Sequence, residues 1–233
     1  MSDETQHTAP ERSDSAPKAD TRFALLRFGG EVTLKSPATR RRFNKRLMKN
    51  LKDAAKANGI VAKIERDHDR VYVEAQSQGD LEQLANCFGI QSISLVERRA
   101  WQSIDDLVAH ALALYKEEVR GKSFALRVRR VGSRNDILLR SQETARVIGA
   151  ALDEHAAKVD LDNPDVEIHL EIMPDWVYFF SEKIPGPGGL PVGVEGSAVS
   201  LVSGGFDSAV ASWLMLKRGV ALDYVFCNMG GRE

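Results

Sequence analysis

The chain has 233 residues, of which 43% are hydrophobic and 28% are charged, and its formal net charge is −1 at pH 7. This length accommodates one to three domains, and the apolar fraction is sufficient for packed cores. The near-neutral net charge points to no class of partner, so only the distribution of charges along the chain is informative.

Two cysteines, Cys87 and Cys227, stand far apart, which argues against a disulfide scaffold or a zinc site and is typical of a cytoplasmic protein. No run of 18 apolar residues occurs, and we expect neither a membrane span nor a secretory signal. Residues 1–21 are almost free of apolar side chains and are predicted to form a disordered tail.

A first domain is expected over residues 22–79. Ser36 and Pro37 are typical of the first residues of a helix, and Gly59 is a stop signal for the same helix. Strands are predicted over 23–28, 60–64, 71–75 and 91–97, and a second, short helix over 80–88. The order strand, helix, strand, strand, helix, strand is that of a ferredoxin-like unit.

The first of these helices is strongly basic. No acidic residue occurs between Lys35 and Lys52, although exposed helix faces usually mix charges because like charges repel. We weigh a phosphate-contacting surface against an ordinary solvated face, and the uncompensated charge favours the first. The residues expected to bind RNA here are Arg40, Arg41, Arg42, Lys45, Arg46 and Lys49.

A second domain is expected over residues 80–184. Helices are predicted over 103–120 and from a cap at Ser141 to residue 158, with strands over 124–130, 165–172 and 175–181. Arg127 and Arg129 should share one strand face, because side chains alternate along a strand. A second RNA-binding patch is expected from Arg127, Arg129, Arg130 and Arg134.

A Pro- and Gly-rich segment follows and is predicted to be a linker, residues 185–197. Residues 198–233 then read as strand, loop, helix and strand, and the loop has the string Ser-Gly-Gly-Phe-Asp-Ser from Ser203 to Ser208. Its glycines permit a sharp turn, and backbone N–H groups with the positive end of a helix form an anion site. The loop lacks the lysine of a Walker motif. A plain strand-to-helix turn is the alternative, which the full string disfavours.

This string resembles the pyrophosphatase loop of the ATP-pyrophosphatase superfamily. Residues 124–130 and 145–149 are similar to a THUMP domain, and residues 31–36 with the basic helix look like the domain that precedes it. In this order, the features of residues 22–233 resemble the tRNA 4-thiouridine synthetase family, also called tRNA sulfurtransferases.

The resemblance implies a fold and a reaction. The fold class is α+β and α/β: a ferredoxin-like domain, a THUMP domain, and the first βαβ unit of a doubly wound sheet. The reaction is 4-thiouridine formation, in which ATP adenylates a tRNA uridine and a persulfide, as from a cysteine desulfurase, supplies the sulfur. Expected cofactors are ATP and Mg²⁺; the partner is tRNA, and the resemblance leaves room for a homodimer.

The resemblance also assigns roles in the loop unit. Ser203, Gly204, Gly205, Asp207 and Ser208 would surround the phosphates, with Leu201 and Val202 against the adenosine. Asp207 is the candidate catalytic residue, acting through Mg²⁺.

One departure from the family is expected to matter. Residues 198–233 provide only about one βαβ unit, with an apolar edge, so we expect a truncated or split form that does not thiolate tRNA alone. Cys227 is expected to be a packed core thiol. The alternative function is a tRNA-binding module with a non-catalytic ATP loop; another ATP-pyrophosphatase, such as an amidotransferase, is disfavoured by the basic patches.

Overall fold

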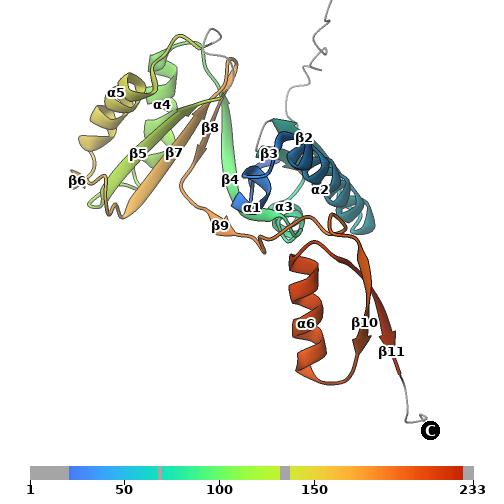
Figure 1. Ribbon diagram of the computed structural model, residues 1–233. Coiled ribbons are helices and arrows are strands. Elements are labelled where there is room, and N and C mark those ends of the chain that lie inside the picture. Colours follow the sequence, from blue (N-terminus) through green and yellow to red (C-terminus); the bar gives the residue numbers. More distant parts are fainter. Residues whose placement is uncertain (1–20, 68–69, 132–136, 228–233) are drawn as a thin grey trace, which may run out of the picture.

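The computed structural model describes residues 21–67, 70–131 and 137–227 (Figure 1). Its strands are β1 Arg22–Phe28, β2 Ala62–Asp67, β3 Arg70–Ala75, β4 Ile90–Ala100, β5 Ser123–Arg130, β6 Lys158–Val159, β7 Val166–Ile172, β8 Trp176–Phe180, β9 Ile184–Pro185, β10 Ser197–Val202 and β11 Ala221–Phe226. Its helices are α1 Gly30–Thr33, α2 Pro37–Ala57, α3 Gln78–Ala85, α4 Ile104–Tyr115, α5 Ser141–Asp153 and α6 Phe206–Lys217. The mixed α/β class expected from the sequence is confirmed.

The first unit, from β1 to β4, has the predicted ferredoxin-like order. Its four strands are antiparallel in the order β2-β3-β1-β4, and α2 packs on them through the buried Phe43, Leu47 and Leu51. α2 begins as predicted, because the Ser36 hydroxyl accepts a hydrogen bond from the backbone N–H of Thr39 at 3.4 Å. The domain boundary expected near residue 79 falls inside α3, and α3 and β4 both pack with β1 in this unit.

The second unit, from α4 to β8, contains the predicted strands and hairpin. β5 and β7 are parallel, β7 and β8 are antiparallel, and α4 and α5 cover one face of the sheet. The predicted helix start at Ser141 is correct, but its role as a cap is wrong, because Arg140 occupies the cap position. The Thr144 hydroxyl instead donates to the Arg140 carbonyl at 2.9 Å.

β4 joins the two units into one sheet. Its first half pairs with β1 and its second half with β8, and in Figure 1 it passes from one unit into the other. The sheet faces that carry no helices meet at this junction: the rings of Tyr72 and Tyr178 stack at 5.2 Å, and Arg70 forms an ion pair with the buried Glu171. We call this junction the crease.

The segment predicted as a linker is fixed to the first unit. The Gly186 and Gly188 N–H groups donate to β4 carbonyls at 2.9 and 2.8 Å, and Leu190 and Val194 are buried in the first core. Arg46 Nε also donates to the Val192 carbonyl at 2.9 Å. These contacts join residues that are far apart in the sequence, so no local pattern reveals them.

In the C-terminal unit, the parallel strands β10 and β11 are connected by α6, as predicted. The expected apolar edge is present, since Phe226 on β11 is 63% exposed. Cys227, just after β11, is exposed as well, so its prediction as a core thiol is wrong: β11 pairs only with β10 among the described residues. Within the described ranges, we find no helix with the length and apolarity to cross a membrane.

Candidate nucleotide loop and nucleic-acid interface

The loop at residues 203–208 connects the end of β10 to the start of α6. Its two ends are tied by Ser208, whose hydroxyl accepts from the Ser203 N–H at 3.3 Å and donates to the Gly205 carbonyl at 3.0 Å. The Ser203 hydroxyl accepts from the Gly205 N–H at 3.3 Å. Both predicted serine hydroxyls therefore brace the loop in this conformation.

The sharp turn predicted for the two loop glycines does not depend on a left-handed backbone. Neither has a positive φ, and Gly205, the N-cap of α6, has an extended φ of −91°. A Cβ built on Gly204 meets no atom within 4 Å. The turn itself therefore does not require glycine at residue 204. What glycine provides is open space beside the backbone, at the positive end of a helix, which fits a phosphate group.

Gly204→Ala separates these two roles. Because the added methyl group meets no protein atom, the melting temperature should change by less than about 2 °C. ATP affinity should nevertheless fall several-fold, since the methyl group occupies the space that we assign to a phosphate. Thermal melting and an ATP titration by calorimetry check both; unchanged ATP affinity would contradict a phosphate position beside Gly204.

Asp207 lies in the first turn of α6 and is exposed. A carboxylate here is stabilised by the helix dipole by about 0.3–1 kcal/mol. However, the N-cap is Gly205, and within the described part of the chain the Asp207 side chain accepts no capping hydrogen bond. Helix capping, which would account for an aspartate at this position even if no ligand bound there, is therefore not its role in this structure.

The described residues contain no group of three or more metal-ligating side chains. Asp207 is the only carboxylate in the string from 203 to 208. This fits a Mg²⁺ ion that is held mainly by nucleotide phosphates, with one carboxylate from the protein.

Sequence reasoning missed two serines beneath the loop. Ser212 on α6 donates to the Ser208 carbonyl at 2.6 Å, and its hydroxyl lies 2.8 Å from that of Ser200 on β10. The signal was available, because Ser212 is a polar residue in an apolar stretch. Of the residues expected against the adenosine, Leu201 is 73% exposed and Val202 is half-buried.

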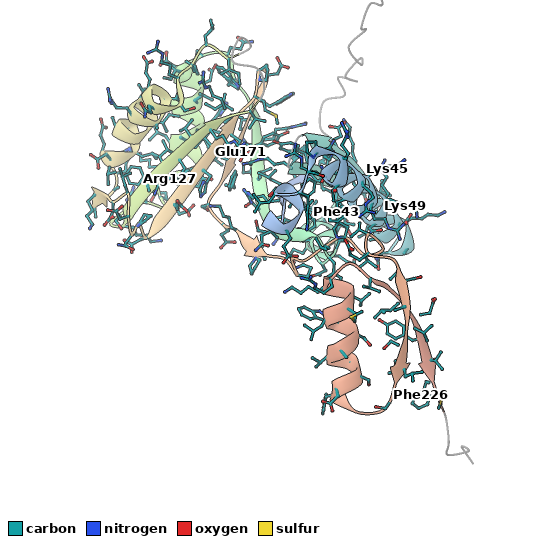
Figure 2. The ribbon with its side chains drawn as sticks, in the orientation of Figure 1. Phe43, Lys45, Lys49, Arg127, Glu171 and Phe226 are labelled. Carbon is teal, nitrogen blue, oxygen red and sulfur yellow. The ribbon has the colours of Figure 1, made fainter. Side chains whose placement is uncertain are left out.

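The basic helix is α2, and the structure divides its cations into two groups. Arg41, Arg42, Lys45 and Lys49 are exposed, and Figure 2 shows Lys45 and Lys49 extending from α2. Lys49 forms an exposed ion pair with Asp53, of a kind that contributes little to stability. Arg40 is half-buried, and Arg46 supports the segment after β9 through its bond to Val192.

The second basic patch is only partly brought together. Arg127 and Arg129 do share the sheet face that carries no helices, as predicted. Arg130 alternates to the other face and donates to the Ile137 carbonyl at 3.4 Å. Arg134 lies outside the described residues.

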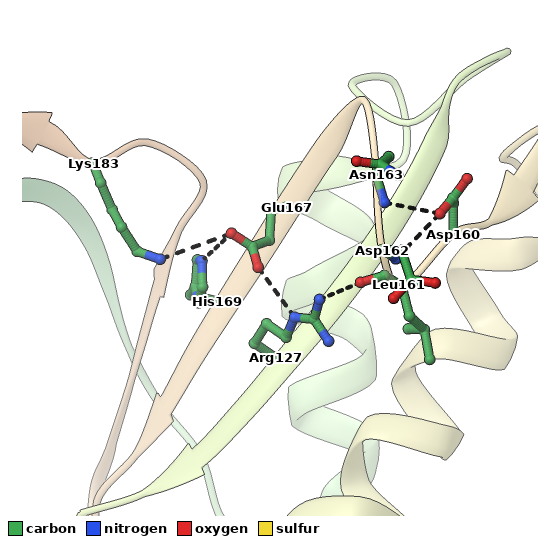
Figure 3. Close-up of polar contacts among 8 residues, drawn as sticks. All are labelled: Arg127, Asp160, Leu161, Asp162, Asn163, Glu167, His169 and Lys183. Carbon is green, nitrogen blue, oxygen red and sulfur yellow. Dashed lines mark hydrogen bonds and ion pairs between the residues drawn. The ribbon is translucent and has the colours of Figure 1, made fainter.

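Figure 3 shows that Arg127 belongs to a charged network. Its Nε donates to Glu167 at 3.1 Å, and the same carboxylate contacts His169 at 3.1 Å and Lys183 at 3.8 Å. Burial would raise the pKa of Glu167, but these partners lower it overall. The pKa of His169 is lowered by burial and by Lys183, so this ring is mostly neutral at pH 7.

Three family models match the chain in sequence order. They are a ThiI ferredoxin-like domain over residues 23–94, a THUMP domain over 102–182, and thiamine biosynthesis protein (ThiI) over 193–232. This chain belongs to the ThiI family. The identification made from the loop and the two α/β units is thereby confirmed.

Known proteins also resemble this chain over most of its length. A probable tRNA sulfurtransferase from Sulfurisphaera tokodaii is 37% identical over 207 residues, which are 89% of this chain and 54% of the relative. The crystal structure of PH1313 from Pyrococcus horikoshii has a TM-score of 0.78 and 30% identity, covering 91% of this chain and 70% of that one.

A 4-thiouridine synthetase in an RNA complex with bound ATP has a TM-score of 0.71 and 28% identity, covering 88% of this chain and 52% of that one. The chain thus spans about half the length of the curated ThiI relatives that it matches.

Proposed function

We propose that this chain binds tRNA and contributes the phosphate-binding loop to an ATP-dependent tRNA sulfurtransferase. We place this enzyme in the cytoplasm, because both tRNA and ATP are present there. The observation that carries the proposal is that two exposed cationic surfaces, on α2 and β5, occur in one chain with an open loop at a helix start. The RNA and the ATP bound to the related 4-thiouridine synthetase support both halves.

The proposed chemistry has two steps. In the first, the C4 oxygen of a tRNA uridine attacks the α-phosphorus of ATP, and pyrophosphate leaves. In the second, the terminal sulfur of a donor persulfide attacks C4, the C4–oxygen bond breaks, and AMP leaves. A second thiol of the donor then attacks the S–S bond of the resulting C4–S–S–donor adduct, which leaves the sulfur on C4 as 4-thiouridine and the donor as a disulfide. The persulfide would come from a donor protein such as a cysteine desulfurase.

The loop residues take part in the first step. Backbone N–H groups at the start of α6 would hold the phosphates, and Asp207 would position Mg²⁺ against the leaving pyrophosphate. Cys87 fits no sulfur-transfer role, because burial raises its pKa to about 11 and keeps it a thiol at neutral pH.

A salt titration tests the RNA half of the proposal. The chain should bind unmodified tRNA, and the logarithm of the binding constant should fall linearly with the logarithm of the salt concentration, by ~0.9 per phosphate contact. Filter binding from 50 to 200 mM KCl measures this slope. Binding that is absent at 50 mM KCl, or that does not change with salt, would contradict the proposal.

A further inference from the structure

The crease between the first two units contains a cavity of about 230 Å³. Strands from both units line it, with β1 and β3 on one side and β5, β7 and β8 on the other. Its charged lining residues are Arg27, Arg70, Arg127, Arg129, Lys183 and Glu171. Figure 2 places Arg127 and Glu171 on the side of the second unit.

Only some of these cations are neutralised by carboxylates. Glu171 pairs with Arg70, and Glu167 is shared by Arg127 and Lys183. Within the described part of the chain, Arg129 has neither an ion pair nor a hydrogen bond. Because His169 is mostly neutral, it adds little charge.

Arg27 is the second uncompensated cation. One terminal nitrogen donates to the Ser94 hydroxyl at 2.9 Å, and the guanidinium lies 4.8 Å from the centre of the Phe180 ring. The other terminal nitrogen, Nη2, is buried without a hydrogen-bond partner among the described residues. Burial lowers the pKa of Arg27 to about 10, with Arg129 contributing, so the group is still charged at pH 7.

We propose that the crease cavity binds one phosphate of the RNA backbone between Arg27 of β1 and Arg129 of β5, an inference that rests on the tRNA binding proposed above. Two uncompensated guanidinium groups and a buried free donor match the oxygens of a phosphate. The volume is below the ~300–1,000 Å³ of pockets that enclose a whole small molecule, which favours a single phosphate over a nucleotide. Since the two arginines belong to different units, RNA bound here would contact both units at once.

Arg129→Gln tests this site, because it removes the charge and breaks no contact made in the structure. The salt dependence of tRNA binding should become shallower by about 0.9, the value for one phosphate contact. Arg120→Gln is the matched control: among the described residues this exposed arginine forms an ion pair only with Glu117, and it lies outside the cavity, so its salt slope should equal that of the wild type. Arg27→Gln should reproduce the loss if its melting temperature is unchanged.

Inorganic phosphate serves as an independent probe. At millimolar concentration it should raise the melting temperature of the wild-type protein and of Arg120→Gln by more than that of Arg129→Gln, which keeps only the phosphate site proposed at the loop before α6. An unchanged salt slope in Arg129→Gln would overturn the proposal even if phosphate binds, because the cavity would then hold a free anion and not RNA. If the wild-type chain binds no tRNA, the proposed function itself fails, which is a different result from an unchanged slope.

Discussion

Replacing Arg41, Arg42 and Lys45 together by glutamate should weaken tRNA binding by on the order of 100-fold at low salt, because three phosphate contacts become repulsive. The fold should survive. All three side chains are exposed, and within the described ranges none of them donates a hydrogen bond; Arg42 only lies over the Phe43 ring, at 5.2 Å. Filter binding with unmodified tRNA measures the loss, and it should be similar for different tRNAs.

The control variant has the same change in net charge, made at three basic residues outside α2. Lys116, Arg120 and Arg146 are exposed residues of the second unit, at the end of α4, between α4 and β5, and in α5, and none of them lines the crease cavity. Their triple replacement by glutamate should weaken binding far less. Arg46 is left unchanged in both variants, because losing its bond to Val192 would disturb the segment that leads to the loop. Equal losses in the two triple variants would mean that net charge, and not the α2 surface, determines binding.

Local signals explain why so much of the first unit could be predicted. Ser36 and Pro37 mark the first turn of α2, and Gly59 has the left-handed φ of 66° expected after a helix. Alternating apolar residues likewise predict β3, of which one face is buried, and a short apolar run predicts β1, in which Ala24, Leu25 and Leu26 are all buried.

Long-range packing explains the failures. The segment after β9 is rich in Gly and Pro, which indicated a free linker, but hydrogen bonds to β4 and α2 fix it in place. Gly193 shows how closely it packs, because a Cβ at this position would overlap the Arg46 guanidinium. No pattern within a few residues of either position contains this information.

In the candidate sites too, local sequence patterns predicted some features, whereas contacts that depend on the folded structure were missed. The loop string predicted the anion site, but not that Ser203 and Ser208 would bond to the loop itself. Strand alternation could have separated Arg130 from Arg129, as it placed Arg127 and Arg129 together. The crease cavity could not be predicted, because Arg27 and Arg129 meet only after the two units pack.

Asp207→Ser should reduce tRNA-dependent pyrophosphate release by about 10²–10³-fold, the usual effect of removing one group that stabilises a transition state. A hydroxyl group cannot replace a carboxylate in positioning Mg²⁺. Stability should hardly change, because Asp207 is exposed and forms no cap in the described structure. The reaction can be followed in a chimera in which this chain replaces the matching part of the Sulfurisphaera tokodaii relative.

The central claim, that this loop activates tRNA with ATP, is tested most directly by pyrophosphate release from three versions of that chimera. The unaltered version and Asp223→Ser, which removes an exposed carboxylate from β11 of the same unit, should release pyrophosphate when tRNA is added. Asp207→Ser should release almost none, at the same melting temperature and tRNA affinity. If a well-folded Asp207→Ser protein released pyrophosphate at the rate of the unaltered version, the claim would be contradicted. The chain would then bind tRNA, but Asp207 of this loop would take no part in the reaction.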